Sequence, residues 1–183
     1  MGGALPVLET LATLESPVRE IRGIINGTCG VVLDEWAAGK TRNDAIATAQ
    51  AAGFAETNPA RDLSGRDSAD KLVLMTQAAF GQWLAPDDIP TRGIDTIAGD
   101  PNGYKLIARA KRTARGISAS VGPERPPPDG FLGQARGPAN RLEIELEGGE
   151  LIRLQGQGAG RWPTTVSVMG DLHEVARRID GMR

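Results

Sequence analysis

The stretch ETNPARDLSGRDSADK, residues 56–71, is the best starting point for predicting the fold of the chain. An apolar run, residues 72–75, follows it directly, and apolar residues then continue at helical spacing. This spacing predicts a helix with one buried side that begins near Ser64 and ends at Gly81. Ser64 followed three residues later by Asp67 is a capping-box pattern, which is typical of a helix start.

Two charged residues of this expected helix share one of its faces. Asp67 and Lys71 stand four residues apart, which brings their side chains together on a helix. A carboxylate and an amine held together at the start of a buried helix can act as an acid/base unit. An ordinary ion pair at a helix terminus has the same spacing, and spacing alone favours this simpler interpretation. Both interpretations therefore stay open at this point.

The composition is typical of a globular protein with one domain. The chain has 183 residues, of which 40% are apolar and 24% are charged, which is enough to bury a core. The formal net charge of −2 gives no general attraction for nucleic acid or for an anionic membrane. We find neither an apolar run of transmembrane length nor a signal-peptide pattern, so we expect a cytoplasmic protein. With one cysteine, Cys29, and one histidine, His173, far apart in sequence, we expect neither a disulfide nor a zinc site.

Helices dominate the first half of the chain and strands the second. The first half is expected to contain a helix over 6–14, a strand over 18–25, and helices over 31–38 and 41–53. In the second half, strands are expected over 104–111, 117–121, 141–147 and 150–155, followed by a helix over 163–179. Residues 82–101 and 123–138 are expected to be mostly loops, and Gly148-Gly149 predicts a hairpin. The order predicts a single α+β domain, residues 1–183, in which helices pack on one face of a mixed β-sheet.

Two loops have features of ligand sites. Asn26, Gly27 and Thr28 join a strand to a helix, where free backbone groups suit a substrate carboxylate or hydroxyl, although plain helix capping uses the same residues. The glycine-rich segment 156–160 also lies between a strand and a helix, but far from the start of a βαβ unit. A complete dinucleotide-binding fold is therefore not expected. An accessory cofactor contact and a tight turn remain about equally open for this segment.

Short blocks along nearly the whole chain form a more specific pattern than any one of them. They are GGALP at 2–6, GIINGT at 23–28, GFAETNP at 53–59 with Asp62, Asp67 and Lys71, GYKLIA at 103–108, and the glycine loop with Pro163-Thr164. In this order they resemble the blocks of homoserine dehydrogenases. The resemblance implies NAD(P)-dependent interconversion of L-aspartate 4-semialdehyde and L-homoserine, a step in threonine, methionine and isoleucine biosynthesis.

The resemblance also implies roles for the charged residues of the opening stretch. Lys71 becomes the acid/base and Asp67 its partner at the reacting oxygen, while Glu56 and Asp62 hold the amino group of the substrate. Reduction of an aldehyde delivers hydride to carbon and leaves charge on oxygen, so a proton donor is needed there. An ammonium group in turn needs carboxylates.

Further residues are assigned by the resemblance alone. It implies that Gly27 and Thr28 line the substrate pocket. The resemblance places a monovalent cation on the main chain of Gly3 and Leu5. Contacts with the nicotinamide cofactor are implied for Gly3, Pro6, Gly158, Ala159 and Gly160.

The sequence differs from the family pattern in its extent and at a few pocket residues. Homoserine dehydrogenases carry a Rossmann domain before the GGALP block, and this sequence begins at that block. We therefore expect NAD(P) to be bound mainly by a domain or subunit supplied in trans, no C-terminal regulatory domain, no turnover by the chain alone, and a homodimer. Phe54 and the run Cys29-Gly30-Val31 alter the pocket wall. The alternative is a non-catalytic binding or dimerisation module that keeps the fold.

Overall fold

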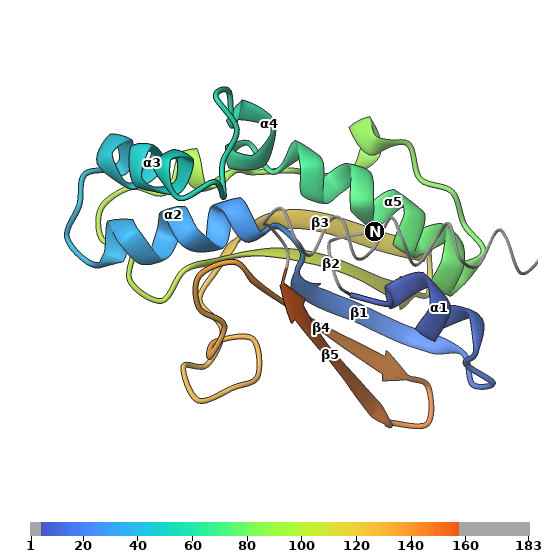
Figure 1. The fold of residues 1–183 in the computed structure, drawn as a ribbon. Helices are drawn as coiled ribbons and strands as arrows, with labels where there is room; N and C mark the ends of the chain where they lie inside the picture. The colour runs from blue at the N-terminus through green and yellow to red at the C-terminus, as the bar shows by residue number, and fades with distance from the viewer. Residues whose placement is uncertain (1–4, 158–183) are drawn as a thin grey trace, which may run out of the picture.

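A five-stranded sheet forms one layer of the protein. The computed structural model describes residues 5–157 (Figure 1). The strands are β1 (Val18–Ile24), β2 (Lys105–Thr113), β3 (Gly116–Glu124), β4 (Ala139–Leu146) and β5 (Leu151–Gln157). Their order in the sheet is β3-β2-β1-β4-β5, and all four pairings are antiparallel.

Two hairpins determine most of these strand directions. β2 and β3 are joined by a short turn that ends at Gly116, whose φ of 113° favours glycine. The Gly148-Gly149 turn joins β4 to β5, as the sequence predicts, and Gly149 N–H donates to the Leu146 carbonyl at 2.9 Å. The sheet is therefore simpler than the expected mixed sheet. Within residues 5–157 parallel pairing is limited to the isolated bridge between Thr91 and Val121.

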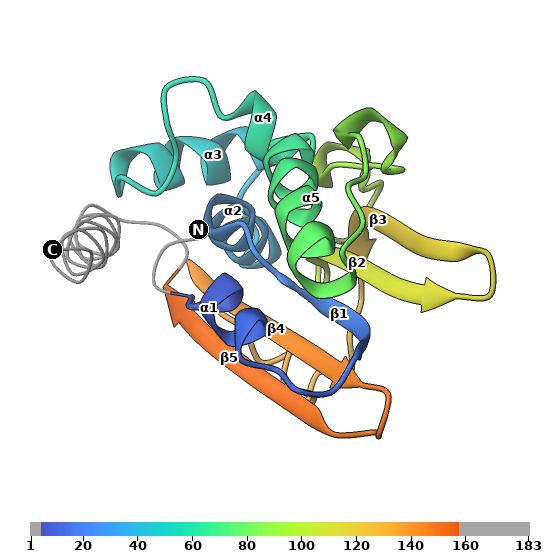
Figure 2. The ribbon, with the colours of Figure 1, turned by 90° about the vertical axis from the view of Figure 1, so that its right-hand side faces the viewer.

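The helices form the second layer. They are α1 (Val7–Ala12), α2 (Gly27–Ala37), α3 (Arg42–Ala51), α4 (Ala60–Leu63) and α5 (Arg66–Phe80), with 3-10 turns η1 (Pro86–Asp88) and η2 (Ile94–Thr96). Figure 2 shows α1, α2 and α5 on the same side of the sheet. α5 contacts β2 and β3, and α2 contacts β2 and β4, whereas α3 and α4 pack on α2 and α5. The predicted α+β class, with helices on one face of a sheet, is confirmed. Among the helices described, none is long and apolar enough to cross a membrane.

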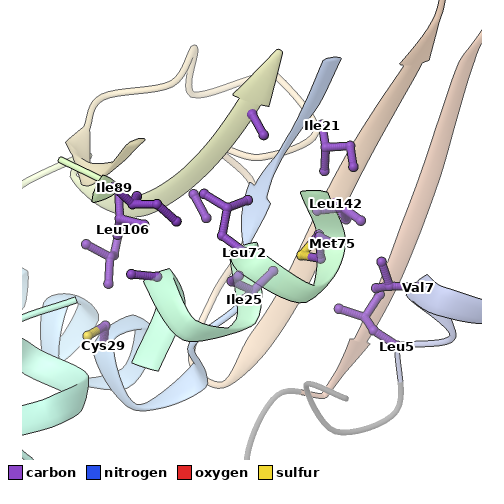
Figure 3. Close-up of a cluster of buried hydrophobic side chains, with 14 of the residues drawn as sticks. Leu5, Val7, Ile21, Ile25, Cys29, Leu72, Met75, Ile89, Leu106 and Leu142 are labelled. Carbon is purple, nitrogen blue, oxygen red and sulfur yellow. The ribbon is translucent and has the colours of Figure 1, made fainter. Parts of the chain in front are cut away.

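The main core fills the space between the two layers. Leu72 and Met75 of α5 meet Ile21 of β1 and Leu142 of β4, and each of these side chains is at most 1% exposed (Figure 3). Burying such side chains contributes on the order of 1.5–3 kcal/mol each. This packing fixes the rotation of α5, and with it the direction in which the charged residues of its first turns point.

The loop over residues 125–138 covers part of the opposite face of the sheet (Figure 1). Its Leu132 and Ala135 pack against Ile24 of β1 and Ile107 of β2 in a small second cluster. The sequence predicts this segment as a surface excursion, and its path lies along the sheet. The loop is also tied to α2, because the Gly137 N–H donates to Asp34 at 2.6 Å.

The start of α2 lies four residues earlier than the sequence predicts. The Asn26 side chain accepts a hydrogen bond from the Cys29 N–H at 2.9 Å, which caps the helix at Gly27. Because glycines occupy this first turn, it lacks the apolar spacing that predicts a helix. The capping interpretation of Asn26 is confirmed.

The capping-box prediction for Ser64 and Asp67 is wrong. A short helix that the sequence does not reveal, α4, ends at Leu63 with Ser64 as its C-cap, and Ser64 Oγ donates back to the Arg61 carbonyl at 3.3 Å. Gly65 adopts a left-handed conformation, with φ of 81°, and occupies the N-cap position of α5. The Asp67 carboxylate is consequently free to face the site described below. α5 ends at Gly81, as predicted.

Several predicted features fall outside the described part of the chain. They are the helix over 163–179, Gly3, and Gly158, Ala159 and Gly160 of the glycine loop.

Candidate active site

The Asp67–Lys71 pair lies on the first turns of α5. Lys71 Nζ is 2.6 Å from Asp67 Oδ2, and the two side chains are 22% and 30% exposed. Lys71 also donates to the Ile25 carbonyl at 3.2 Å, just beyond the end of β1. The lysine is thus fixed at both ends of its side chain: by the helix that carries it and by the strand that it reaches. The ion pair is therefore partly buried.

Asp62 joins this pair from α4. Asn26 Nδ2 donates to Asp62 Oδ1 at 2.6 Å and to Asp67 Oδ2 at 2.8 Å. A single amide therefore contacts two carboxylates from two different helices. The structure brings together three of the predicted site residues, Asp62, Asp67 and Lys71, around Asn26.

The sequence does not reveal the role of the Asn26 side chain. The strand-to-helix junction at Asn26, Gly27 and Thr28 suggests a ligand site through its backbone groups, and the family resemblance assigns only Gly27 and Thr28 to the pocket. Its side chain is buried, at 3% exposure. An asparagine before a glycine-rich helix start signals a cap, but only the fold shows that α4 and α5 deliver carboxylates to the other end of the same amide.

The electrostatic balance of the cluster is negative. Burial is the largest cause of a raised pKa at Asp62; the negative charges of Asp67 and Glu56 raise it further, while the Asn26 hydrogen bond and Lys71 lower it. Glu56 is exposed and acts on the cluster through its charge. The charges of three carboxylates therefore outweigh that of one ammonium group, which leaves negative charge for a further cation.

The other two predicted pocket residues, Thr28 and Gly27, have mainly structural roles in the contacts described. Thr28 is 7% exposed, and its hydroxyl donates to the Phe54 carbonyl at 2.7 Å. Gly27, the first residue of α2, is buried. The Thr28 hydrogen bond holds the 53–57 segment, which includes Glu56, against the start of α2.

Cys29 has the environment of a structural thiol. It is fully buried, and its Sγ donates to the Asp62 carbonyl at 3.1 Å. Burial, the largest cause, and the nearby carboxylates raise its pKa well above the usual value. Since a thiolate is the reactive form, this environment does not suit a nucleophile. Cys29 instead ties α4, and so Asp62, to α2.

Two residues implied in cation and cofactor binding lie at the beginning of the described chain. Leu5 is 3% exposed and packs beside Val7 in the core (Figure 3), while its carbonyl accepts from the Val7 N–H at 2.9 Å. Pro6 is exposed and occupies the N-cap position of α1, where its carbonyl accepts from the Thr10 N–H at 3.0 Å. These contacts describe the two residues without testing their predicted roles.

The geometry of the cluster suits two functions: proton transfer at Lys71 and binding of an ammonium group at the neighbouring carboxylates. A lysine ammonium that is held by a carboxylate can pass a proton to an oxygen atom, or receive one from it. The surplus carboxylates, Asp62 and Glu56, suit an ammonium group of a small ligand. A substrate with an amine at one end and an oxygen undergoing reaction at the other fits such an arrangement.

Comparisons with known proteins give a consistent family. The homoserine dehydrogenase family model matches residues 6–173. Homoserine dehydrogenases from Lactococcus lactis and Pseudomonas aeruginosa are each 32% identical to this chain, over 97% of its length and over 44% and 43% of theirs. The chain thus spans less than half the length of these relatives.

Solved structures agree with the sequence comparisons. The crystal structure of a homoserine dehydrogenase from Thiobacillus denitrificans superposes with a TM-score of 0.89 at 28% identity, covering 98% of this chain and 44% of that one. The fold is also that of a hyperthermophilic archaeal homoserine dehydrogenase in complex with NADPH, with a TM-score of 0.84 at 23% identity over 97% of this chain and 54% of that one. The chain belongs to the homoserine dehydrogenase family.

Proposed function

We propose that this chain is the substrate-binding and catalytic part of a homoserine dehydrogenase, which interconverts L-aspartate 4-semialdehyde and L-homoserine with NAD(P). The observation that carries the proposal is the Lys71 ammonium, held 2.6 Å from Asp67 within a cluster of surplus carboxylates. Family membership supports the same reaction.

Lys71 acts as the acid in the direction of reduction. A bound nicotinamide would supply hydride to the aldehyde carbon. Lys71 donates a proton to the oxygen, where negative charge develops. In the reverse direction Lys71 accepts this proton from the hydroxyl group of homoserine. Asp67 and the Ile25 carbonyl keep the ammonium in place during both steps.

The other carboxylates hold the substrate. Asp62 and Glu56 attract the substrate ammonium group and so fix the end of the molecule that does not react. Thr28 and the buried Gly27 shape the pocket beside them, and the Thr28 hydrogen bond to the Phe54 carbonyl positions the 53–57 segment. Orientation of this kind turns a bimolecular encounter into a defined geometry.

We further propose that NAD(P) is held mainly by a nucleotide-binding domain or subunit outside this chain. The chain spans less than half of its curated relatives, and an archaeal relative with the same fold was solved with NADPH. Pro6, Gly3 and residues 158–160 would contact the cofactor, and the main chain of Gly3 and Leu5 would bind a monovalent cation. We also propose a cytoplasmic location.

A homodimer through the sheet completes the proposal. The face opposite the helices is only partly covered by the 125–138 loop and carries charges of both signs, as in the pairs Arg109–Glu20 at 3.5 Å and Arg153–Glu143 at 3.2 Å. A surface with mixed charges can match a second copy of itself about a two-fold axis.

The role of Lys71 is tested by Lys71→Ala in a chain joined to the nucleotide-binding domain of a relative. We expect homoserine-dependent NAD(P) reduction to fall by roughly 10²–10⁴-fold, the usual contribution of a general acid or base. The exposed Lys40, between α2 and α3, provides the matched control, because Lys40→Ala removes an equal charge at the end of α2 that lies away from the cluster. Substantial activity in the Lys71→Ala enzyme contradicts the proposed role.

Calorimetry with homoserine separates catalysis from a non-catalytic module. Binding of homoserine by the joined protein, weakened by Glu56→Gln, supports the substrate assignment. Absence of both binding and turnover in the joined wild-type protein favours the module that keeps the fold without the chemistry.

A further inference from the structure

The junction between β1 and α2 contacts three charged residues of the site. Lys71 Nζ donates to the Ile25 carbonyl, and the neighbouring residue, Asn26, donates to both Asp62 and Asp67. These charged residues come from α4 and α5, which lie 36 to 46 positions further along the chain. One short backbone segment therefore sets the relative positions of groups from two helices.

All hydrogen-bonding groups of the Asn26 amide are used. Its Oδ1 accepts from the Cys29 N–H at 2.9 Å, and its Nδ2 donates to Asp62 at 2.6 Å and to Asp67 at 2.8 Å. An asparagine has two N–H donors, and here each has its own carboxylate. The opposite orientation of the amide is excluded, because it would set Oδ1 against two carboxylates and Nδ2 against an N–H donor.

We propose that Asn26 is a positioning residue that holds Asp62 beside the Asp67–Lys71 pair without adding positive charge, and so leaves the negative charge that Lys71 does not balance for the ammonium group of the substrate. The inference deepens the proposed function and rests on it for the identity of the ligand. The geometric part, an amide that organises two carboxylates, stands on the contacts alone.

The residue type follows from the charge balance. Two neighbouring carboxylates repel each other, and a lysine or arginine between them would cancel the charge that attracts the substrate. An amide gives each carboxylate a hydrogen bond, lowering the energy of the ionised forms while adding no charge. Of the uncharged side chains, only asparagine and glutamine carry two such donors.

Asn26→Asp separates positioning from capping. An aspartate accepts the Cys29 N–H as well as asparagine does, so the cap of α2 is kept. An ionised carboxylate has no donor, so both contacts to Asp62 and Asp67 are lost. A residue that served only as a helix cap would tolerate this substitution.

The experiment is a ¹³C and ¹⁵N NMR titration of the full chain. In the wild-type protein, we expect the Asn26 side-chain N–H resonances to shift in step with ionisation of the Asp62 carboxyl. In the Asn26→Asp variant, we expect Asp62 to titrate at higher pH, because a donor is replaced by another negative charge. The charged groups that act on Asp62 are Asp67 and Lys71 of α5 and Glu56 of the preceding loop; the neutral thiol of Cys29 lies beside them, and Asp95 of η2 acts on that thiol.

Two results overturn the proposal. One is an Asp62 titration that does not move in a folded Asn26→Asp variant; the other is a pair of wild-type Asn26 N–H resonances that ignore Asp62 ionisation. The second measurement needs no variant, so it decides the matter even if Asn26→Asp fails to fold. Thr41→Asp, at the cap of α3, is the control and leaves the Asp62 titration unchanged. Since none of these readouts uses homoserine, a failed substrate assignment is distinguishable from a failed positioning role.

Discussion

Gly30→Ala tests how closely the 125–138 loop is fitted to α2. A Cβ added at Gly30 would lie 2.3 Å from the Gly137 carbonyl oxygen, whereas ordinary van der Waals contact begins near 3.4 Å. Helix and loop must therefore separate by about 1 Å. The Gly137 N–H is bonded to Asp34 of the same helix at 2.6 Å, so this movement also strains a hydrogen bond.

The size of the effect follows from two opposing contributions. Replacing glycine by alanine within a helix stabilises it by about 0.5–1 kcal/mol. Overpacking against backbone costs about 1–3 kcal/mol, and the hydrogen bond adds to this cost. We expect a net loss of about 1–2 kcal/mol, which for a chain of this length lowers Tm by about 2–8 °C.

Thermal unfolding followed by circular dichroism measures this change. Gly148→Ala is the matched control, because nothing lies within 4 Å of a Cβ at Gly148 and its φ is not positive. We expect that control to leave Tm unchanged or slightly raised. A Gly30→Ala protein as stable as the wild type would show that the loop is not packed against α2 as described.

The remaining predictions concern the half-buried Asp62 and the buried Cys29 of the site. Because the pKa of Asp62 is raised on folding, the folded chain holds its proton to higher pH than the unfolded chain, and stability falls as pH rises through that window. Asp62→Asn should therefore raise Tm at pH 7, and the gain should shrink towards pH 4; a gain that is equal at both pH values contradicts this reasoning. Cys29 should react with iodoacetamide at pH 8 more slowly than in urea, on the order of 100-fold or more, and mass spectrometry showing equal rates would contradict its burial.

The local elements were predictable where the signal is local. The end of α5 at Gly81 and the turn at Gly148-Gly149 follow from the conformational freedom of glycine. The helix α4 was not predictable, because four residues are too few to show a period. The early start of α2 was not predictable from apolar spacing, because its first turn lacks an apolar repeat. The sequence at Asn26 fits both a helix cap and a ligand site.

The site was predictable in part for a similar reason. Asp67 and Lys71 are four residues apart, so a helix alone brings them together. Asp62 enters the same network through Asn26, which lies 36 positions earlier in the chain. That contact depends on how α4 packs on α2, which no periodicity expresses. The family resemblance supplied Asp62 and Glu56, and the structure supplied Asn26.

The central position of β1 has a consequence for the order in which the protein is made. Its partner strands begin at Lys105 and Ala139, so an emerging chain carries β1 unpaired on one edge until β4 has been synthesised. The sheet is therefore closed by its most distant contacts, which are the slowest to form. Throughout that interval the edge of β1 is open to other chains, and a ribosome that stalls before residue 146 releases a product prone to aggregation.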